Sequence, residues 1–207
     1  MFNLGENRDT FTDLIKPAGD CRIEYIFGTC LVLDIRWLFN LLLSLSENND
    51  HKEKWSDPGR LLSAFRSYRE KMDLFVQFGK IERTSYDLLL EEGKHFIRQV
   101  RVDKNSIFHP KVWIVEYSNP DNELFYKVIV SSRNAVFGAT LESYILLEGR
   151  YDEKVKQRNN NLIRFIKDCY KHTDDTEHSS YPDDFIKRLS KVELISDKNY
   201  YDEFFII

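Results

Sequence analysis

The sequence has few cysteines, no long apolar run and no excess of positive charge. Its 207 residues include three cysteines, Cys21, Cys30 and Cys169, which are widely spaced and form no CxxC pair. An odd, scattered set argues against a disulfide framework and against a zinc cage. We therefore expect the chain to work in a reducing cytoplasm.

The charge balance limits the kinds of partner. Lys and Arg total 30 and Asp and Glu total 34, which gives a net charge of -4. This excludes a uniformly basic surface of the kind that binds polyanions without selectivity. Any nucleic acid must therefore meet a local basic patch.

Segments typical of export or membrane insertion are also missing. Residues 1–20 carry acids and polar residues where a signal peptide needs a basic start and an apolar stretch. The most apolar segment, residues 31–45, is interrupted by Asp34, Arg36 and Asn40, so it lacks the roughly 20 apolar residues of a spanning helix. We expect a core element there and no membrane partner.

The residues that are present favour a single α/β domain. Hydrophobic residues make up 42% of the chain and aromatic residues 14%, which is enough for one sizeable core or at most two small ones. Aromatic and β-branched content predicts strands over residues 25–33, 73–78, 94–102, 108–117, 124–131 and 144–149. Helical spacing predicts helices capped by Asp34, from residue 61 after a Pro-Gly turn, and over 159–171 and 182–192. The predicted architecture is a mixed β-sheet with flanking helices over residues 1–207.

One predicted hairpin places a candidate site. The turn-forming segment SNPDNE separates residues 111–117 from residues 124–131, so these strands should pair in antiparallel fashion. The region of His109 then lies near that of Asn134. His109 and Lys111 form an HxK pattern that should place both side chains on one face of a strand, and Ser132 and Asn134 return beside them.

An imidazole, an ammonium, a hydroxyl and an amide at one place suit a phosphodiester substrate. A neutral His109 imidazole can attack phosphorus, while Lys111 and Asn134 hold the charged oxygens. This chemistry needs no metal and no other cofactor. Glu116, if it lies near the histidine, can fix its tautomer; otherwise it is an ordinary strand acid.

These residues resemble the signature of the phospholipase D superfamily, which runs HxK, four residues, Asp, then GSxN. His109, Lys111, Ser132 and Asn134 match it, whereas Glu116 replaces the Asp and Ser131 the Gly. The chain looks most similar to the amino-terminal half of tyrosyl-DNA phosphodiesterases. The resemblance implies a phospholipase D-like half-domain with nuclease or DNA-repair activity.

The same resemblance implies a missing partner. In that family a second HxK faces the first and its histidine protonates the leaving oxygen, but this chain has one HxK only. We expect the second motif in a further carboxy-terminal segment or in a second copy of the chain. The apolar residues 204–207 also favour a partner that covers them.

A basic run leads into the motif and can follow a phosphate backbone, although a solvated strand edge explains it equally well. The predicted nucleic-acid-binding residues are Arg98, Arg101, Lys104 and Arg133. Phe96, Phe108 and Trp113 interleave with the run and can stack on bases or belong to the core.

Three functional hypotheses follow. The first is one half of a phospholipase D-like phosphodiesterase acting on nucleic acid. The second is a homodimeric nuclease with one shared site. The third is a degenerate domain that binds nucleic acid or protein without catalysis, in which His109 is satisfied by backbone and Ser132 and Asn134 only end a strand.

Overall fold

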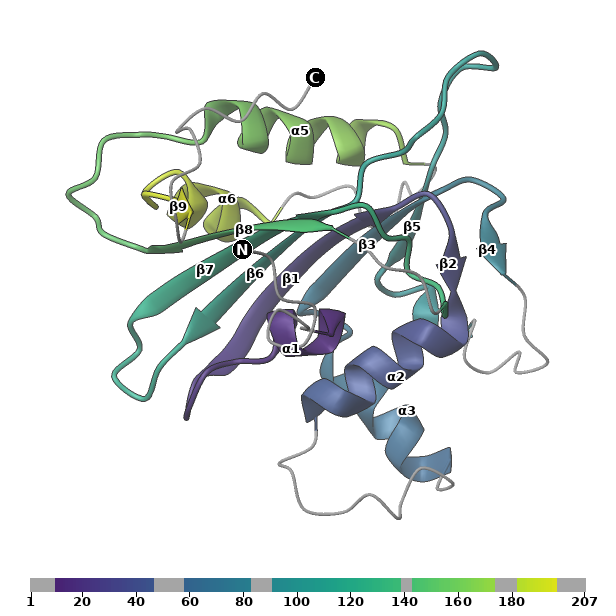
Figure 1. Cartoon of the computed structure of the whole chain (residues 1–207), viewed down its shortest axis with the longest axis horizontal. Helices are drawn as coiled ribbons and strands as arrows, with labels where there is room; N and C mark the ends of the chain where they lie inside the picture. Colours follow the sequence, from purple (N-terminus) through teal and green to yellow (C-terminus); the bar gives the residue numbers. More distant parts are fainter. Residues whose placement is uncertain (1–9, 47–57, 83–90, 139–142, 174–181, 197–207) are drawn as a thin grey trace, which may run out of the picture.

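A mixed seven-stranded sheet with helices on both faces forms the centre of the protein (Figure 1). The computed structural model describes residues 10–46, 58–82, 91–138, 143–173 and 182–196. The strands of the sheet, in spatial order, are β5 (Ile97–Val100), β3 (Met72–Gln77), β1 (Arg22–Cys30), β6 (Val112–Ser118), β7 (Leu124–Ser131), β8 (Tyr144–Arg150) and β9 (Ile195–Ser196). A small separate pair joins β2 (Leu33–Asp34) to β4 (Ile81–Glu82) in parallel.

β1 divides the sheet into two halves. It pairs in parallel with β3, which pairs in parallel with β5. On its other side β1 pairs in antiparallel fashion with β6, and the strands from β6 to β9 continue as an antiparallel series. The predicted hairpin is therefore confirmed, and so is the mixed sheet with flanking helices.

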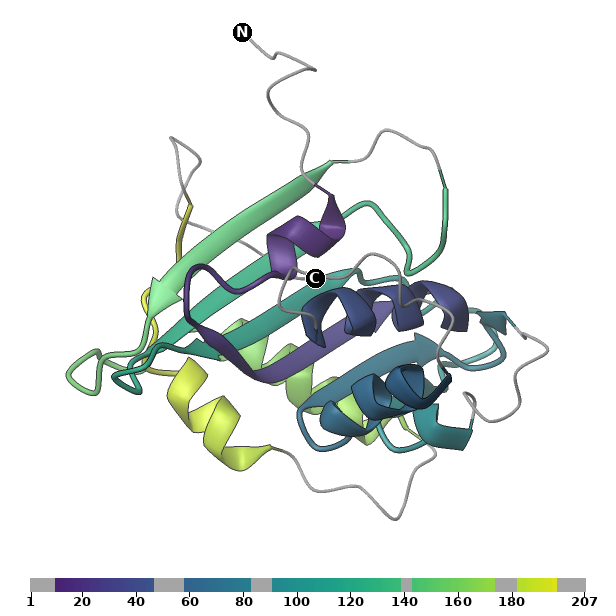
Figure 2. The same cartoon turned by 90° about the horizontal axis from the view of Figure 1, so that it is seen from below.

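Two groups of helices cover the two faces (Figures 1 and 2). α1 (Phe11–Ile15), α2 (Ile35–Ser46) and α3 (Pro58–Ser67) pack on one face, and α5 (Asn160–Lys171) and α6 (Asp183–Leu189) pack on the other. α2 begins directly after Asp34, as predicted. None of the helices in the described ranges is long and apolar enough to span a bilayer.

The alternation of side chains along β6 shows how the two cores are separated. Trp113 and Val115 belong to the core beneath α2, whereas Val112 and Ile114 belong to the core beneath α5. Trp113 also explains why Gly28 stands opposite it in β1, because a Cβ on Gly28 would lie 2.7 Å from the indole ring.

Several predicted boundaries were wrong. The strand expected over 25–33 ends at Cys30, and the one expected over 108–117 begins only at Val112. Pro58 and Gly59 form no turn but start α3, because proline is well suited to a first helical position. The short elements α1, β4 and β9 were not predicted. Residues 174–181 and the apolar residues 204–207 lie outside the described residues.

Candidate functional site

The ends of several strands meet at one edge of the sheet. β1 ends at Cys30 and β7 at Ser131, and β6 begins there at Val112 because it runs antiparallel to both. The Thr29 hydroxyl, fully buried, accepts a bond from Val112 N at 2.8 Å and lies 3.2 Å from Val112 O, to which it donates. Thr29 thus fixes the start of β6 against the end of β1.

His109 and Lys111 lie at this edge but precede β6, so the HxK is not within a strand as expected. His109 is exposed, and the Lys111 side chain is buried. Lys111 Nζ lies 3.0 Å from His109 Nε2, 3.2 Å from its Nδ1 and 3.1 Å from its carbonyl oxygen. An ammonium group only donates hydrogen bonds, so Lys111 Nζ donates to the His109 carbonyl oxygen.

Asn134 is held at the same edge through its side-chain oxygen. Asn134 Oδ1 accepts bonds from Leu31 N at 3.2 Å and Val32 N at 3.5 Å. The next residue, Ala135, pairs with Leu33 and accepts a bond from Asp34 N at 2.8 Å. Because backbone N–H groups fix the oxygen side of the amide, Asn134 Nδ2 is the end left to donate to a ligand.

Ser132 lies between these residues and β8. Its backbone N donates to Ser143 O at 3.0 Å, and its hydroxyl oxygen accepts a bond from Ser143 N at 3.2 Å. The neighbouring Ser131 N donates to Lys111 O at 3.0 Å, which connects the SSxN segment to the HxK segment. The structure therefore brings His109, Lys111, Ser132 and Asn134 to one edge of the sheet.

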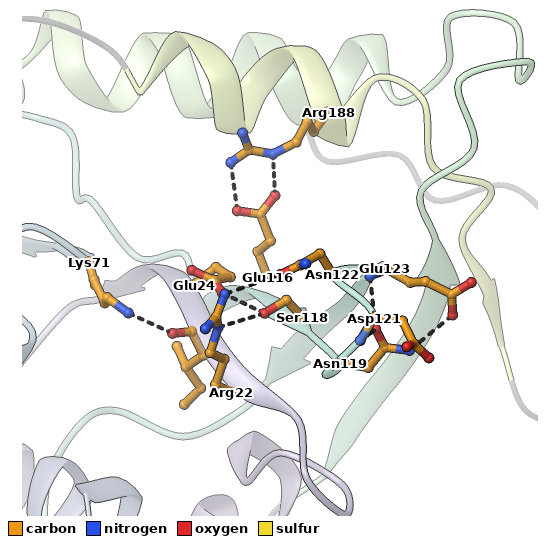
Figure 3. A network of polar contacts seen from close by, with 11 residues as sticks. Arg22, Glu24, Lys71, Glu116, Ser118, Asn119, Asp121, Asn122, Glu123 and Arg188 are labelled. Carbon is orange, nitrogen blue, oxygen red and sulfur yellow. Dashed lines mark hydrogen bonds and ion pairs between the residues drawn. The ribbon is translucent and has the colours of Figure 1, made fainter.

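Glu116 is not part of this group. It is fully buried, and it lies on the opposite sheet face from Lys111, because odd and even residues of β6 face different cores. Its carboxylate accepts hydrogen bonds from Nε and Nη2 of Arg188 in α6, at 2.6 and 2.8 Å (Figure 3). It also accepts a bond from the Tyr126 hydroxyl. The expected contact of Glu116 with the histidine ring is wrong; the carboxylate attaches α6 to the sheet.

The predicted basic surface is also only partly present. Arg98 is buried, and its Nε donates to Asp73 at 2.6 Å beneath α5, so it does not face a nucleic acid. Arg133 Nη2 donates to the carbonyls of Val136 and Gly138 and supports that loop. Arg101 and Lys104 are exposed, as the prediction required.

The aromatic residues expected to stack on bases are in the core. Phe96, Phe108 and Trp113 are 1%, 9% and 2% exposed. The large hydrophobic side chains that are exposed near this edge are those of Phe78, Ile107 and Phe137, together with Tyr144 and Ile145 at the start of β8. Sequence analysis did not single them out, although Phe78 directly precedes a glycine at the end of a predicted strand, where exposure is common.

Two further residues shape the edge without having been predicted. Gln77 Oε1 accepts a bond from Phe108 N at 2.9 Å and so fixes the segment before His109. Cys30 lies next to Lys111, but burial raises the pKa of its thiol to about 12 despite the neighbouring lysine charge. A thiol with such a pKa stays protonated near neutral pH and is a poor nucleophile.

A cavity of about 640 Å³ lies elsewhere in the molecule. It is lined by residues such as Cys21, Tyr117, Phe125, Lys127 and Ile195, which belong to the opposite end of β6 and to its neighbours. It therefore does not contain the HxK. In the described part of the chain no three His, Cys, Asp or Glu side chains come together in a way that could hold a metal ion.

A comparison of the sequence with profiles of known protein families found no match, and a comparison with curated proteins found none either.

Proposed function

We propose that this chain is a phospholipase D-type phosphodiesterase domain that acts on nucleic acid through a covalent phosphohistidine on His109. The observation that carries the proposal is the contact of Lys111 Nζ with the His109 ring, 3.0 Å from Nε2, at the edge where Leu31 and Val32 hold Asn134. An exposed imidazole beside an ammonium and a fixed amide suits attack on phosphorus.

The reaction takes two steps. A ring nitrogen of His109 attacks phosphorus in line, a P–N bond forms, and the bond to the leaving oxygen breaks. Water then attacks the phosphohistidine and the P–N bond breaks, which restores the imidazole. Lys111 and Asn134 Nδ2 donate to the non-bridging oxygens, whose negative charge needs donors during both steps.

The leaving oxygen needs a proton, and a second histidine supplies it in this proposal. It comes from a second HxK, either in a further segment or in a second copy of this chain. A missing general acid typically slows such a step by about 100- to 10,000-fold. The chain alone as a monomer should therefore be nearly inactive, whereas the assembled pair should be active.

The test is to trap the covalent adduct. A labelled oligonucleotide with a good leaving group should give an acid-labile protein adduct, in excess chelator as well as without it. His109→Ala should abolish the adduct while it leaves oligonucleotide binding nearly intact, because Lys111 and Asn134 remain. His95→Ala, which changes a histidine outside the motif, is the matched control.

Two outcomes contradict the proposal. An adduct that forms equally fast in His109→Ala excludes His109 as the nucleophile, and complete loss of activity on chelation excludes the metal-independent reaction. If the unmodified protein binds nucleic acid but forms no adduct in any oligomeric state, the degenerate binding domain becomes the better hypothesis.

A further inference from the structure

Exposed rings flank the candidate site on two sides. Phe78 is 43% exposed directly after β3, and Phe137 is 54% exposed three residues after Asn134. Most aromatic side chains of the described residues are buried in the two cores. An exposed aromatic ring beside a nucleic-acid site can stack on a base.

Phe78 carries an arginine on one side. The guanidinium carbon of Arg101 lies 3.3 Å from the centroid of the Phe78 ring, which is the geometry of a cation–π stack. The backbone beneath the stack is fixed, because Phe78 N donates to Val100 O at 2.9 Å and Arg101 N donates to His172 O at 2.9 Å. The pair is therefore a rigid, positively charged platform.

The platform is tied to the catalytic edge through short connections. Gln77, the neighbour of Phe78, accepts the bond from Phe108 N at 2.9 Å, and Phe108 precedes His109. On the other side, Arg133 donates to the carbonyls of Val136 and Gly138, one residue before and one after Phe137. The first connection holds the Phe78 segment against the HxK segment in space, and the second supports the loop of Phe137, which directly follows the SSxN segment.

We propose that the Phe78–Arg101 pair is a base-stacking subsite, and that the substrate strand is single-stranded where it crosses this edge. This inference rests on the proposed function, since the phosphate must reach His109 at the same time. A base in a duplex has both faces covered by its neighbours, whereas an unpaired base offers a free face to a ring or guanidinium. The positive charge of Arg101 next to the ring suits a nucleotide better than an apolar protein partner.

The experiment measures binding of an uncleaved strand. Fluorescence anisotropy in the His109→Ala protein should be recorded with a single-stranded oligodeoxynucleotide of about 12 nucleotides, within the usual length for such sites. Phe78→Leu keeps an apolar side chain but removes the ring. We expect it to weaken binding by about 5- to 100-fold, the range for the loss of one stacked base.

An abasic strand of equal length and Ile195→Ala are the controls. The abasic strand keeps the phosphates, so Phe78→Leu should barely change its affinity. Ile195 is 64% exposed on β9, away from the motif, and Ile195→Ala should bind both strands like the parent. A duplex of the same sequence should bind more weakly than the single strand and respond less to Phe78→Leu.

The inference is overturned if Phe78→Leu binds the single strand as tightly as the parent, if the abasic strand is affected equally, or if the parent binds neither strand. It is also overturned if Phe78→Leu changes the mass of the protein in solution from dimer to monomer, because Phe78 is then a protein contact. If Phe78→Leu weakens binding of the single strand as expected, but the unmodified protein forms no covalent adduct, the result contradicts only the proposed function.

Discussion

At the scale of single residues, the Asp34 carboxylate accepts a hydrogen bond at the start of α2 and forms an ion pair with Arg36. Asp34 Oδ1 accepts a bond from the backbone N of Arg36 at 2.9 Å, and Oδ2 pairs with its guanidinium at 2.7 Å. Burial acts to raise the pKa of the Asp34 carboxyl, but the bonds and charge of Arg36 outweigh it and hold this pKa below its ordinary value. The ionised carboxylate therefore stabilises the folded state.

We predict that Asp34→Ala lowers the free energy of unfolding by about 1 to 2 kcal/mol at neutral pH, as expected for a lost N-cap. Because the pKa is lower in the folded than in the unfolded chain, this stability is present above about pH 4 and is lost as pH falls through the folded pKa. Urea unfolding of Asp34→Ala at pH 7 checks the loss of the cap. Urea unfolding of Asp34→Asn at pH 7 and at pH 3 checks the pH dependence, because its difference from the parent should shrink at acid pH. Asp121→Asn, in the exposed β6–β7 turn, should change stability by less than about 0.5 kcal/mol at either pH.

The site residues show what a sequence pattern can and cannot provide. His109, Lys111 and Asn134 were predictable, because a hairpin with a clear turn brings its ends together. That Glu116 faces away from Lys111 was also predictable from the sequence, because residues an odd number of positions apart in a strand face opposite sides of the sheet. The burial of Arg98 was not predictable from the sequence, because only the tertiary fold places Asp73 of β3 beside it.

At the scale of secondary structure, α6 is attached to the sheet by one buried ion pair. Glu116 is fully buried, and the Arg188 side chain is 35% exposed. Figure 3 shows that the pair connects α6 to β6 and is separate from the polar contacts near the turn of the hairpin. Burial and the neighbouring carboxylate raise the pKa of Tyr126, so its hydroxyl stays a donor to Glu116.

We predict that Glu116→Gln lowers the free energy of unfolding by about 1 to 3 kcal/mol, since Arg188 then keeps a charge without its counter-ion. Glu123→Gln is the matched control, because Glu123 and its partner Arg150 are 40% and 57% exposed, and it should cost less than about 1 kcal/mol. Chemical denaturation measures both. Equal losses for the two variants would contradict the structural role of Glu116.

The predictability of the elements followed their length and pattern. β7 and α5 were predicted almost to the residue, because each has a strong pattern bounded by turn formers. α1, β4 and β9 have five, two and two residues, which is too short for a periodic signal. Their positions depend on contacts that are remote in sequence: α1 contacts α2, β6 and β7, β4 pairs with β2, and β9 pairs with β8.

At the scale of the whole molecule, the strand order could not be predicted. Sequence patterns located β1, β3 and the strands from β5 to β8 but did not indicate that β1 lies between β3 and β6. That arrangement follows from the buried faces of the two cores and from the close approach of Trp113 to Gly28. The candidate site depends on it, since the ends of β1 and β7 meet the start of β6 only in this order.

The division of the sheet at β1 also has a kinetic consequence. The half from β6 to β8 consists of sequential antiparallel neighbours, whereas β1, β3 and β5 are parallel and need longer crossover connections between them. Chain segments close in sequence find each other fastest, because less loop entropy is lost. The β6–β8 half should therefore become ordered first.

We predict that pulsed hydrogen exchange during refolding will protect amides of β6 and β7 before those of β3 and β5. Joining β1 to β6 closes a loop of more than 80 residues between Gly28 and Trp113, so this step should come late. Thr29→Val, which removes the hydroxyl that bonds to Val112, should then accelerate unfolding more than it slows folding. Earlier protection of β3 would show instead that the parallel half forms the nucleus.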